Sequence, residues 1–343
     1  FGYRDAINFL GEYNFNFDNK IVYGIDSEFD ASRYPKDYGD SDREHDESII
    51  SQYFDFQFRP FEKLYSTFGL RSDNHSTVGR KTSGRTTLAY QLNGNNKIRS
   101  SFGAGVRFPA LYDYIYGSST IVDKGGTLEQ LKSERGLSFD LGYDTYLNNL
   151  DLGLSMTLFK TKQKNSLLSN ARTGWVVANA NGVNTSQGIE LSSNWKPVDK
   201  KISLNFGYTF TDSYDAATCD PDEKASYADG ECLYKGSKLD SAKVRVPRHA
   251  IQSKINYNIR PNLKSSLKGK YVGETRDFGN TNNGWTDIIL TDYFVLDLET
   301  SYQLFNDYKA VINIRNILDE EYEQAYQYSS MGRTFNFGIK RVY

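Results

Sequence analysis

Apolar and polar residues alternate along the C-terminal segment from Gly332 to Tyr343. Phe335, Phe337 and Ile339 share one side of an extended chain, and the residues between them are polar or small. A period of two is typical of a β-strand whose two sides meet different environments. The segment also ends on an aromatic residue, whose ring is most stable at a boundary between membrane and water. The pattern therefore predicts a strand suited to a membrane.

The same alternation recurs through the rest of the chain, in segments 150–158, 202–211, 251–259, 296–304 and 310–315. One side of these segments is nearly free of charge, whereas the other carries Lys, Asp, Glu and Arg. Soluble β-sandwiches alternate too, but a lipid exterior around a wet lumen explains this contrast better than a sandwich core does. We expect these side chains to face outward: Leu204, Phe206, Leu298, Ile312, Phe335 and Phe337.

Fifteen segments fit this pattern, and the connections between them alternate in length. The predicted strands cover residues 3–17, 20–33, 48–60, 62–73, 82–92, 97–108, 134–147, 149–165, 175–196, 201–214, 248–260, 262–277, 289–305, 308–318 and 332–343. Short turns on one rim and long polar loops on the other are typical of outer-membrane barrels, whose long loops are extracellular. The sequence thus predicts an all-β fold: a transmembrane antiparallel β-barrel with an up-and-down meander.

The odd strand count places the two ends of the predicted wall on opposite sides of the membrane. Bacterial single-chain barrels have even strand numbers, and open strand edges in hydrocarbon leave backbone groups unpaired. We therefore expect an incomplete barrel, the C-terminal part of a larger one. The chain begins at Phe1 without a signal peptide, so we expect the natural N-terminus to lie upstream.

Composition narrows the class further. No run approaches the roughly 20 apolar residues that a transmembrane helix needs. The 26 Tyr and 21 Phe, against 7 Pro, fit strands with aromatic girdles. A net charge of -2 without a basic block argues against nucleic acid as a partner.

The only two cysteines, Cys219 and Cys232, lie in a polar loop. Two cysteines in a protein of an oxidising compartment favour a single disulfide, and two free thiols are the alternative. No histidine lies near them, which argues against a metal site.

Several segments carry a more specific pattern. Residues 316–323, read Asn-Ile-Leu-Asp-Glu-Glu-Tyr-Glu, precede Gly332-Arg333 and the final aromatic strand. Residues 102–109 read Phe-Gly-Ala-Gly-Val-Arg-Phe-Pro. These segments resemble the closing Asn-Leu-Phe-Asp-x-x-Tyr signature and the Gly-x-x-Phe-Arg-Ala-Pro segment of TonB-dependent outer-membrane receptors, with Phe108 in place of Ala.

Three further landmarks follow in the order of that family. Residues 131–134 resemble Leu-x-Pro-Glu, with Ser133 in place of Pro, and Asp140 replaces the Glu of the next motif. Asn181 with residues 188–190 resembles Asn…Gly-Val-Glu, and residues 245–249 resemble Arg-x-Pro-x-His. Five landmarks in order make the resemblance specific from about residue 70 to the C-terminus.

The resemblance implies a barrel of 22 strands, of which about 15 lie in residues 1–343, and a plug domain that this chain lacks. It implies a receptor that binds cobalamin or a ferric siderophore outside the cell. TonB, reached through the missing N-terminal region, would energise uptake. The segment Asp73-Asn74-His75-Ser76 looks most like the cobalamin branch, although siderophore receptors share most of these features. Outer-membrane lipid and lipopolysaccharide would surround the barrel.

Two alternatives remain open at this point. A passive porin would need a closed, even barrel of about 16–18 strands with an open lumen. A soluble all-β carbohydrate-binding or adhesion protein would place the apolar sides in a core. No enzyme is predicted, because His45, His75 and His249 are scattered and no nucleophile motif or phosphate loop is present.

Aromatic residues in or beside the long loops are candidate ligand contacts, because aromatic rings give large contact area at low entropy cost. The alternative for each is the outer aromatic girdle. The candidates are Tyr112, Tyr114, Tyr116, Trp175, Trp285, Tyr326 and Tyr328.

An acidic loop is a candidate calcium site, because carboxylate oxygens are the ligands that Ca²⁺ prefers. The loop contains Asp37, Asp40, Asp42, Glu44, Asp46 and Glu47, and its candidate ligands are Asp37, Asp40, Asp42 and Asp46. A solvated loop, or one that meets ions bridging lipopolysaccharide, is the alternative, and no other cofactor is expected. Near the same rim, we expect Arg107, Arg245 and Arg248 to pair with carboxylates rather than with an anionic chelate.

Overall fold

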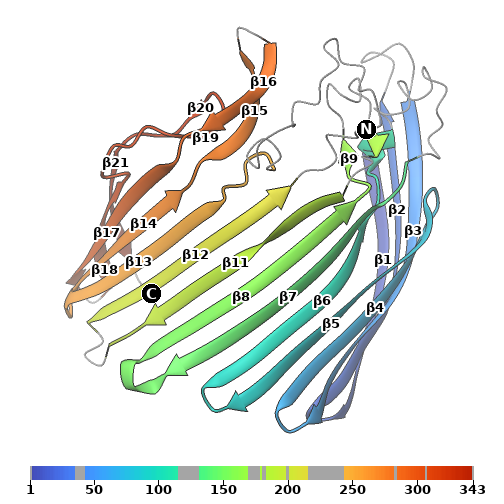
Figure 1. Cartoon of the computed structure of the whole chain (residues 1–343), viewed down its shortest axis with the longest axis horizontal. Helices are drawn as coiled ribbons and strands as arrows, with labels where there is room; N and C mark the ends of the chain where they lie inside the picture. Colours follow the sequence, from blue (N-terminus) through green and yellow to red (C-terminus); the bar gives the residue numbers. More distant parts are fainter. Residues whose placement is uncertain are drawn as a thin grey trace.

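The computed structural model describes residues 2–34, 43–114, 131–168, 178–179, 183–197, 201–214, 243–281, 284–305 and 307–341. A 15-stranded antiparallel sheet dominates it, and each strand pairs with its neighbours in chain order (Figure 1). The strands are β1 (Gly2–Asn16), β2 (Asn19–Tyr34), β3 (Arg43–Phe61), β4 (Leu64–His75), β5 (Gly79–Asn93), β6 (Asn96–Arg107), β7 (Glu134–Leu147), β8 (Leu152–Lys164), β11 (Val183–Trp195), β12 (Ile202–Tyr214), β13 (His249–Arg260), β14 (Leu263–Val272), β17 (Tyr293–Phe305), β18 (Tyr308–Arg315) and β21 (Thr334–Arg341). The predicted meander and its strand count are confirmed.

The two rims of the sheet differ as the sequence predicts. Figure 1 shows short turns along one rim and longer connections along the other. β7 and β8, for example, are joined by one 3-10 turn, Asn148–Leu150, after which Asp151 adopts a φ of 51°. The rim of the longer connections, called the loop rim below, corresponds to the predicted extracellular side.

Three further two-stranded sheets belong to connections of the loop rim. They are β9 (Leu167–Leu168) with β10 (Ala178–Asn179), β15 (Thr275–Thr281) with β16 (Gly284–Leu290), and β19 (Glu323–Ala325) with β20 (Tyr328–Ser329). In Figure 1 the β15–β16 hairpin rises beyond the ends of β14 and β17.

The β15–β16 hairpin corrects the predicted strands 262–277 and 289–305 and the loop predicted between them. Pairing of β14 with β17 ends at Val272, opposite Tyr293. Beyond that point the chain continues as β15 and β16, which pair with each other instead. The strand predicted over 175–196 is likewise shorter in the main sheet, where β11 begins at Val183.

The register aligns apolar side chains across the sheet. Residues directly opposite each other in antiparallel strands point to the same side. One row runs without interruption from β7 to β21: Leu147, Leu152, Trp195, Leu204, Ile255, Leu267, Leu298, Ile314 and Phe335. The row contains three of the residues predicted to point outward, and its side of the sheet is called the apolar face below. Phe206, Ile312 and Phe337 fall on the same side in neighbouring rows.

The apolar face is not buried by the rest of the described chain. Phe335 is 70% exposed, Phe337 71% and Ile7 78%. Among the described residues, the buried hydrophobic side chains are Tyr114, Leu131, Leu290 and Tyr293, and Val78 and Leu167 pack against the first two. An apolar surface of this extent marks contact with a membrane or with a partner. Because the face is continuous across a barrel-type sheet, lipid is the environment that fits these side chains. No helix within the described ranges is long and apolar enough to cross a membrane.

Candidate functional site

Ion pairs within single strands and between strands two apart lie on the opposite side of the sheet, called the polar face below. Arg71 lies 3.0 Å from Asp26 and 2.7 Å from Asp73. Arg85 lies 2.8 Å from Asp55. These arginines are 40% and 64% exposed, so their ion pairs contribute little to stability. Their main effect is to fix donors and acceptors on a hydrated surface.

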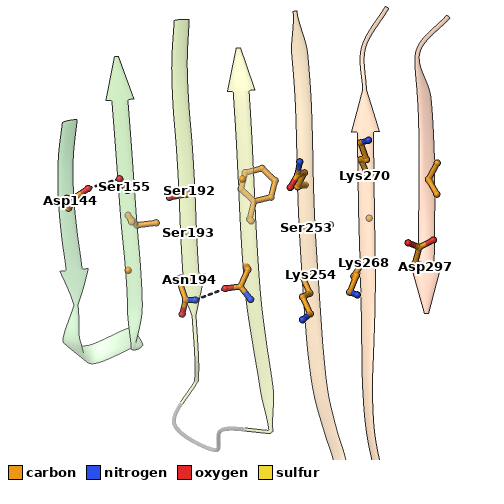
Figure 2. Close-up of a pocket in the computed structure, with 18 of the residues that line it drawn as sticks. Asp144, Ser155, Ser192, Ser193, Asn194, Ser253, Lys254, Lys268, Lys270 and Asp297 are labelled. Atoms are coloured by element: carbon orange, nitrogen blue, oxygen red, sulfur yellow. Dashed lines mark hydrogen bonds between the residues drawn. The ribbon is translucent and has the colours of Figure 1, made fainter. Parts of the chain in front are cut away.

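A groove of about 970 Å³ runs across the polar face from β7 to β17. Figure 2 shows that Asp144 and Ser155 stand at one end, whereas Lys254, Lys268 and Asp297 stand at the other. Ser155 Oγ donates a 2.6 Å hydrogen bond to Asp144, which also lies 3.1 Å from Lys97 and 3.3 Å from Arg99, so the charge at that end is already paired. The groove is therefore a wet, shallow surface with charges of both signs.

The lysines make the far end of the groove basic. Lys254 and Lys268 are directly opposed on β13 and β14, and Lys268 lies 3.7 Å from Glu299. Lys270 Nζ lies 5.8 Å from the ring centroid of Tyr293, which stacks on Tyr322 with a centroid distance of 4.1 Å. A loop residue thus packs against the sheet at this end. The arrangement suits docking of a polar or anionic surface.

A buried cluster lies at the loop-rim ends of β3 and β4. His75 is fully buried, and its Nδ1 accepts hydrogen bonds from the backbone N–H groups of Thr77 (3.1 Å) and Val78 (3.3 Å). The proton of a neutral His75 must therefore lie on Nε2, which faces Glu47 Oε2 at 3.2 Å. The turn after β4 thus fixes the tautomer of His75, whereas the contact between Nε2 and Glu47 lacks hydrogen-bond geometry.

Asp73 and Ser76 complete the local motif around His75. Asp73 accepts hydrogen bonds from Ser51 (2.6 Å) and Arg71 (2.7 Å). Ser76 exchanges backbone and side-chain hydrogen bonds with Ser48 at 2.9 and 3.0 Å. These contacts pin the end of β4 to β3, so the motif has a structural role in this chain.

Tyr114 closes the cluster from the helical turn at residues 111–114. Its ring is fully buried and lies 4.3 Å, centroid to centroid, from the ring of His45. Burial, reinforced by the nearby carboxylate of Glu47, raises the pKa of Tyr114 above its ordinary value. Its hydroxyl has no hydrogen-bond partner among the described residues. Tyr112 on the same turn is 56% exposed.

A second polar cluster joins three connections of the loop rim. Asp277 of β15 is fully buried and accepts hydrogen bonds from Arg245 Nε (3.0 Å) and the backbone N–H of Tyr326 (2.7 Å). The backbone N–H of Arg245, a residue with a φ of 61°, donates to the carbonyl of Arg276 at 2.7 Å. The β15–β16 hairpin, the segment before β13 and the β19–β20 hairpin are thereby held together.

Close packing at Gly279 strengthens this junction. A Cβ added to Gly279 would lie 2.3 Å from the ring of Tyr326. Arg276, which is almost fully buried, lies 2.6 Å from Asp287 across the same hairpin. The two hairpins therefore form one packed unit, called the hairpin pair below.

The candidate aromatic residues fall into two groups. Tyr112 and Tyr114 lie after β6, whereas Trp285, Tyr326 and Tyr328 belong to the hairpin pair. Tyr328 is 75% exposed, in contrast to the buried Tyr114.

The remaining candidate residues divide between those within and those beyond the described ranges. Asp46 is exposed on β3. The other candidates lie outside the described residues, so their calcium, ligand and disulfide roles stay predictions: Asp37, Asp40, Asp42, Tyr116, Trp175, Cys219 and Cys232. Within the described part of the chain, no group of three or more metal-binding side chains converges.

The three rim arginines lie beside carboxylates, as expected. Arg107 lies 3.0 Å from Glu134, and Arg248 lies 4.0 Å from Asp212. Arg245 lies 3.0 Å from Asp277. The buried acid Glu47 belongs to the acidic loop considered as a calcium site, whereas Asp277 is not predicted as a site residue, because its partners lie far away in sequence and no local motif marks it.

A family model described as "TonB dependent receptor-like, beta-barrel" matches residues 1–317. The probable TonB-dependent receptor BfrD of Bordetella pertussis is 24% identical over 287 residues, which cover 76% of this chain and 35% of that protein. The vitamin B12 transporter BtuB of Vibrio cholerae is 24% identical over 279 residues, covering 79% and 38%. The chain thus spans little more than a third of the length of these relatives.

Solved structures share the fold. The ferric enterobactin receptor PfeA of Pseudomonas aeruginosa superposes with a TM-score of 0.73 at 14% identity, covering 99% of this chain and 54% of that one. The siderophore receptor PirA of Acinetobacter baumannii gives a TM-score of 0.72 at 16% identity, covering 99% and 55%. At such identities the likeness concerns architecture alone.

Proposed function

The chain belongs to the TonB-dependent receptor family of bacterial outer-membrane β-barrels, and from that premise we propose that it forms the barrel wall of an active-transport receptor. The ligand class is a scarce nutrient complex, cobalamin or a ferric siderophore, taken up with energy from TonB. The observation that carries the proposal is the family match along residues 1–317. The BtuB relative, a vitamin B12 transporter, and the siderophore-receptor neighbours support the ligand class.

The two faces of the sheet support a barrel wall with a filled interior. The apolar face fits the lipid of the outer membrane, and the polar face offers the charged groove from β7 to β17. A groove that contains both lysines and aspartates suits contact with a polar protein domain better than contact with solvent alone, because such a domain can supply each charge with a partner. We assign the groove to a plug domain, and contact with TonB to a region outside residues 1–343.

The sheet edges support a larger closed barrel. β1 pairs with β2 and β21 pairs with β18, and the described strands do not pair β1 with β21. Unpaired backbone groups in hydrocarbon cost several kcal/mol each, so both edges need partner strands in the membrane. Residues 1–343 would then be one part of the barrel, completed by strands from another part of the protein.

The hairpin pair supplies the best candidate ligand surface. It is rigidly built around buried Asp277, yet it presents Tyr328 with 75% exposure at the loop rim. Rigid support beneath an exposed aromatic ring lowers the entropy cost of binding. Tyr112 is the corresponding exposed residue on the other side of the rim.

Uptake measurements test the proposed function. The full-length gene is expressed in a bacterium that lacks its own cobalamin and siderophore receptors, with and without TonB. We expect saturable uptake of radiolabelled cobalamin or of one ferric siderophore, and its loss without TonB. Uptake that is unsaturable and independent of TonB would instead support a passive porin and overturn the proposal.

A further inference from the structure

The outer half of β8 breaks the rule that the apolar face lacks charge. Leu154, Met156 and Leu158 lie on that face, and the next side chains with the same parity are Lys160, Lys162 and Lys164. The register confirms the side, because Leu158 lies opposite Leu141 and Ile189. Figure 1 shows β8 rising from the short-turn rim to the loop rim, so the lysines occupy its outer end.

A fourth cation stands beside these lysines. Arg135 of β7 lies directly opposite Lys164. All four side chains are exposed, and none has a hydrogen bond or ion pair with any described residue. Alternate residues of a strand are about 6.8 Å apart, and opposed Cβ atoms about 5 Å apart. Arg135, Lys160, Lys162 and Lys164, called the basic patch below, therefore concentrate four positive charges on two adjacent strands.

Nothing in the neighbouring strands neutralises the basic patch. The residues opposite the three lysines on β11 are Val183, Thr185 and Gln187. Among the described residues, the nearest acid on the same face is Asp212 of β12, one strand further, which accepts a hydrogen bond from Gln187 at 3.5 Å and lies 4.0 Å from Arg248. Like charges directly opposite each other in a sheet are destabilising. An external anion would remove that repulsion.

The position of the patch identifies the kind of anion. Leu137 and Phe139 of β7 lie directly opposite Lys162 and Lys160, and below them the same face carries the apolar side chains that start at Leu141 and Leu158, at the depth of acyl chains. Cations just above an apolar belt meet the headgroup layer, where lipid phosphates lie. We propose that the basic patch binds the phosphate groups of a phosphorylated glycolipid of the outer leaflet, lipopolysaccharide, with its acyl chains against the apolar belt.

Binding of lipid A to the purified full-length receptor tests this assignment by native mass spectrometry in detergent. The variant carries Lys160→Gln, Lys162→Gln and Lys164→Gln. The matched control carries Lys264→Gln, Lys309→Gln and Lys340→Gln on the polar face of β14, β18 and β21, outside the groove. Each basic residue near a lipid surface changes affinity roughly fivefold, so we expect the patch variant to bind bisphosphorylated lipid A at least tenfold more weakly, with the control unchanged.

The remaining arms separate the sources of phosphate. Dephosphorylated lipid A and phosphatidylglycerol should bind the wild-type receptor as weakly as lipid A binds the patch variant. The assignment is overturned if the wild type and the patch variant bind lipid A with equal affinity. It is also overturned if the wild type binds phosphatidylglycerol as tightly as it binds lipid A. Heat-modifiable migration on gels checks that each variant folds, and Lys162→Gln alone is used if the triple variant does not. The readout is independent of transport, so it stands whichever nutrient the receptor takes up.

Discussion

The wall of the sheet and its loop rim are built by different rules. In the wall, the side on which a residue lies follows from its immediate neighbours, as Phe206 and Asn205 of β12 demonstrate. At the loop rim, the buried Asp277 is held by Arg245 and Tyr326, which belong to other connections. The effect of a substitution in the wall on stability should therefore depend on whether that one side chain faces lipid or water. A change at the rim should spread from one loop to another.

The largest expected effect belongs to the wall. Phe206→Arg places a charge on the apolar face, and a charged residue near the bilayer midplane of such a barrel costs about 2–4 kcal/mol of stability. Denaturant unfolding of the full-length receptor in lipid vesicles measures the change. The control, Asn205→Arg, places the same residue on the polar face and should change stability by less than about 0.5 kcal/mol. Equal effects at the two positions would refute the assignment of the faces.

The same contrast explains which features the sequence predicts. Alternation is a local property, so it identifies the strands, their faces and the short turns. Alternation does not show with which strand a segment pairs. For this reason the sequence predicts that the segments after Val272 and before Tyr293 extend the main sheet, whereas they form the separate hairpin β15–β16.

The candidate sites were harder to predict for a related reason. Tyr112, Tyr114 and Tyr116 are spaced as if they shared one side of a strand, but residues 111–114 form a helical turn. That turn exposes Tyr112 and buries Tyr114. The importance of Asp277 depends on partners in two other connections, which spacing along the chain does not reveal.

The next largest effect should come from the junction at the loop rim. Asp277→Asn removes the charge that accepts hydrogen bonds from Arg245 and Tyr326, at a local cost of about 1–3 kcal/mol. Because the contact joins two hairpins, we expect faster amide hydrogen exchange in both residues 275–290 and residues 323–329. Glu321→Gln, at an exposed acid of the same rim, is the control. Faster exchange in only one hairpin would contradict their coupling.

A smaller, pH-dependent effect is expected at Tyr114. Its raised pKa in the folded protein means that the unfolded chain loses this proton first as the pH rises. The contribution to stability is therefore complete below about pH 10, the ordinary value, and declines above it by at most about 1.4 kcal/mol per pH unit. Tyr114→Phe should flatten the loss of stability between about pH 10 and pH 11. Tyr112→Phe, at the exposed neighbour, should leave the slope unchanged, and identical slopes in all three proteins would exclude this role for Tyr114.

The smallest effect on stability, and the sharpest on binding, should come from Tyr328. Its side chain is 75% exposed, so Tyr328→Ala should change unfolding by less than about 0.5 kcal/mol. If its ring contacts ligand, the affinity of energy-depleted cells for the transported complex should fall about 5- to 30-fold, as for other aromatic contact residues. Tyr326→Ala provides the comparison, because the ring of Tyr326 packs against Gly279 and its loss should also loosen the hairpin pair. A Tyr328→Ala receptor that binds as tightly as the wild type would place the ligand elsewhere on the rim, with Tyr112 as the next residue to change.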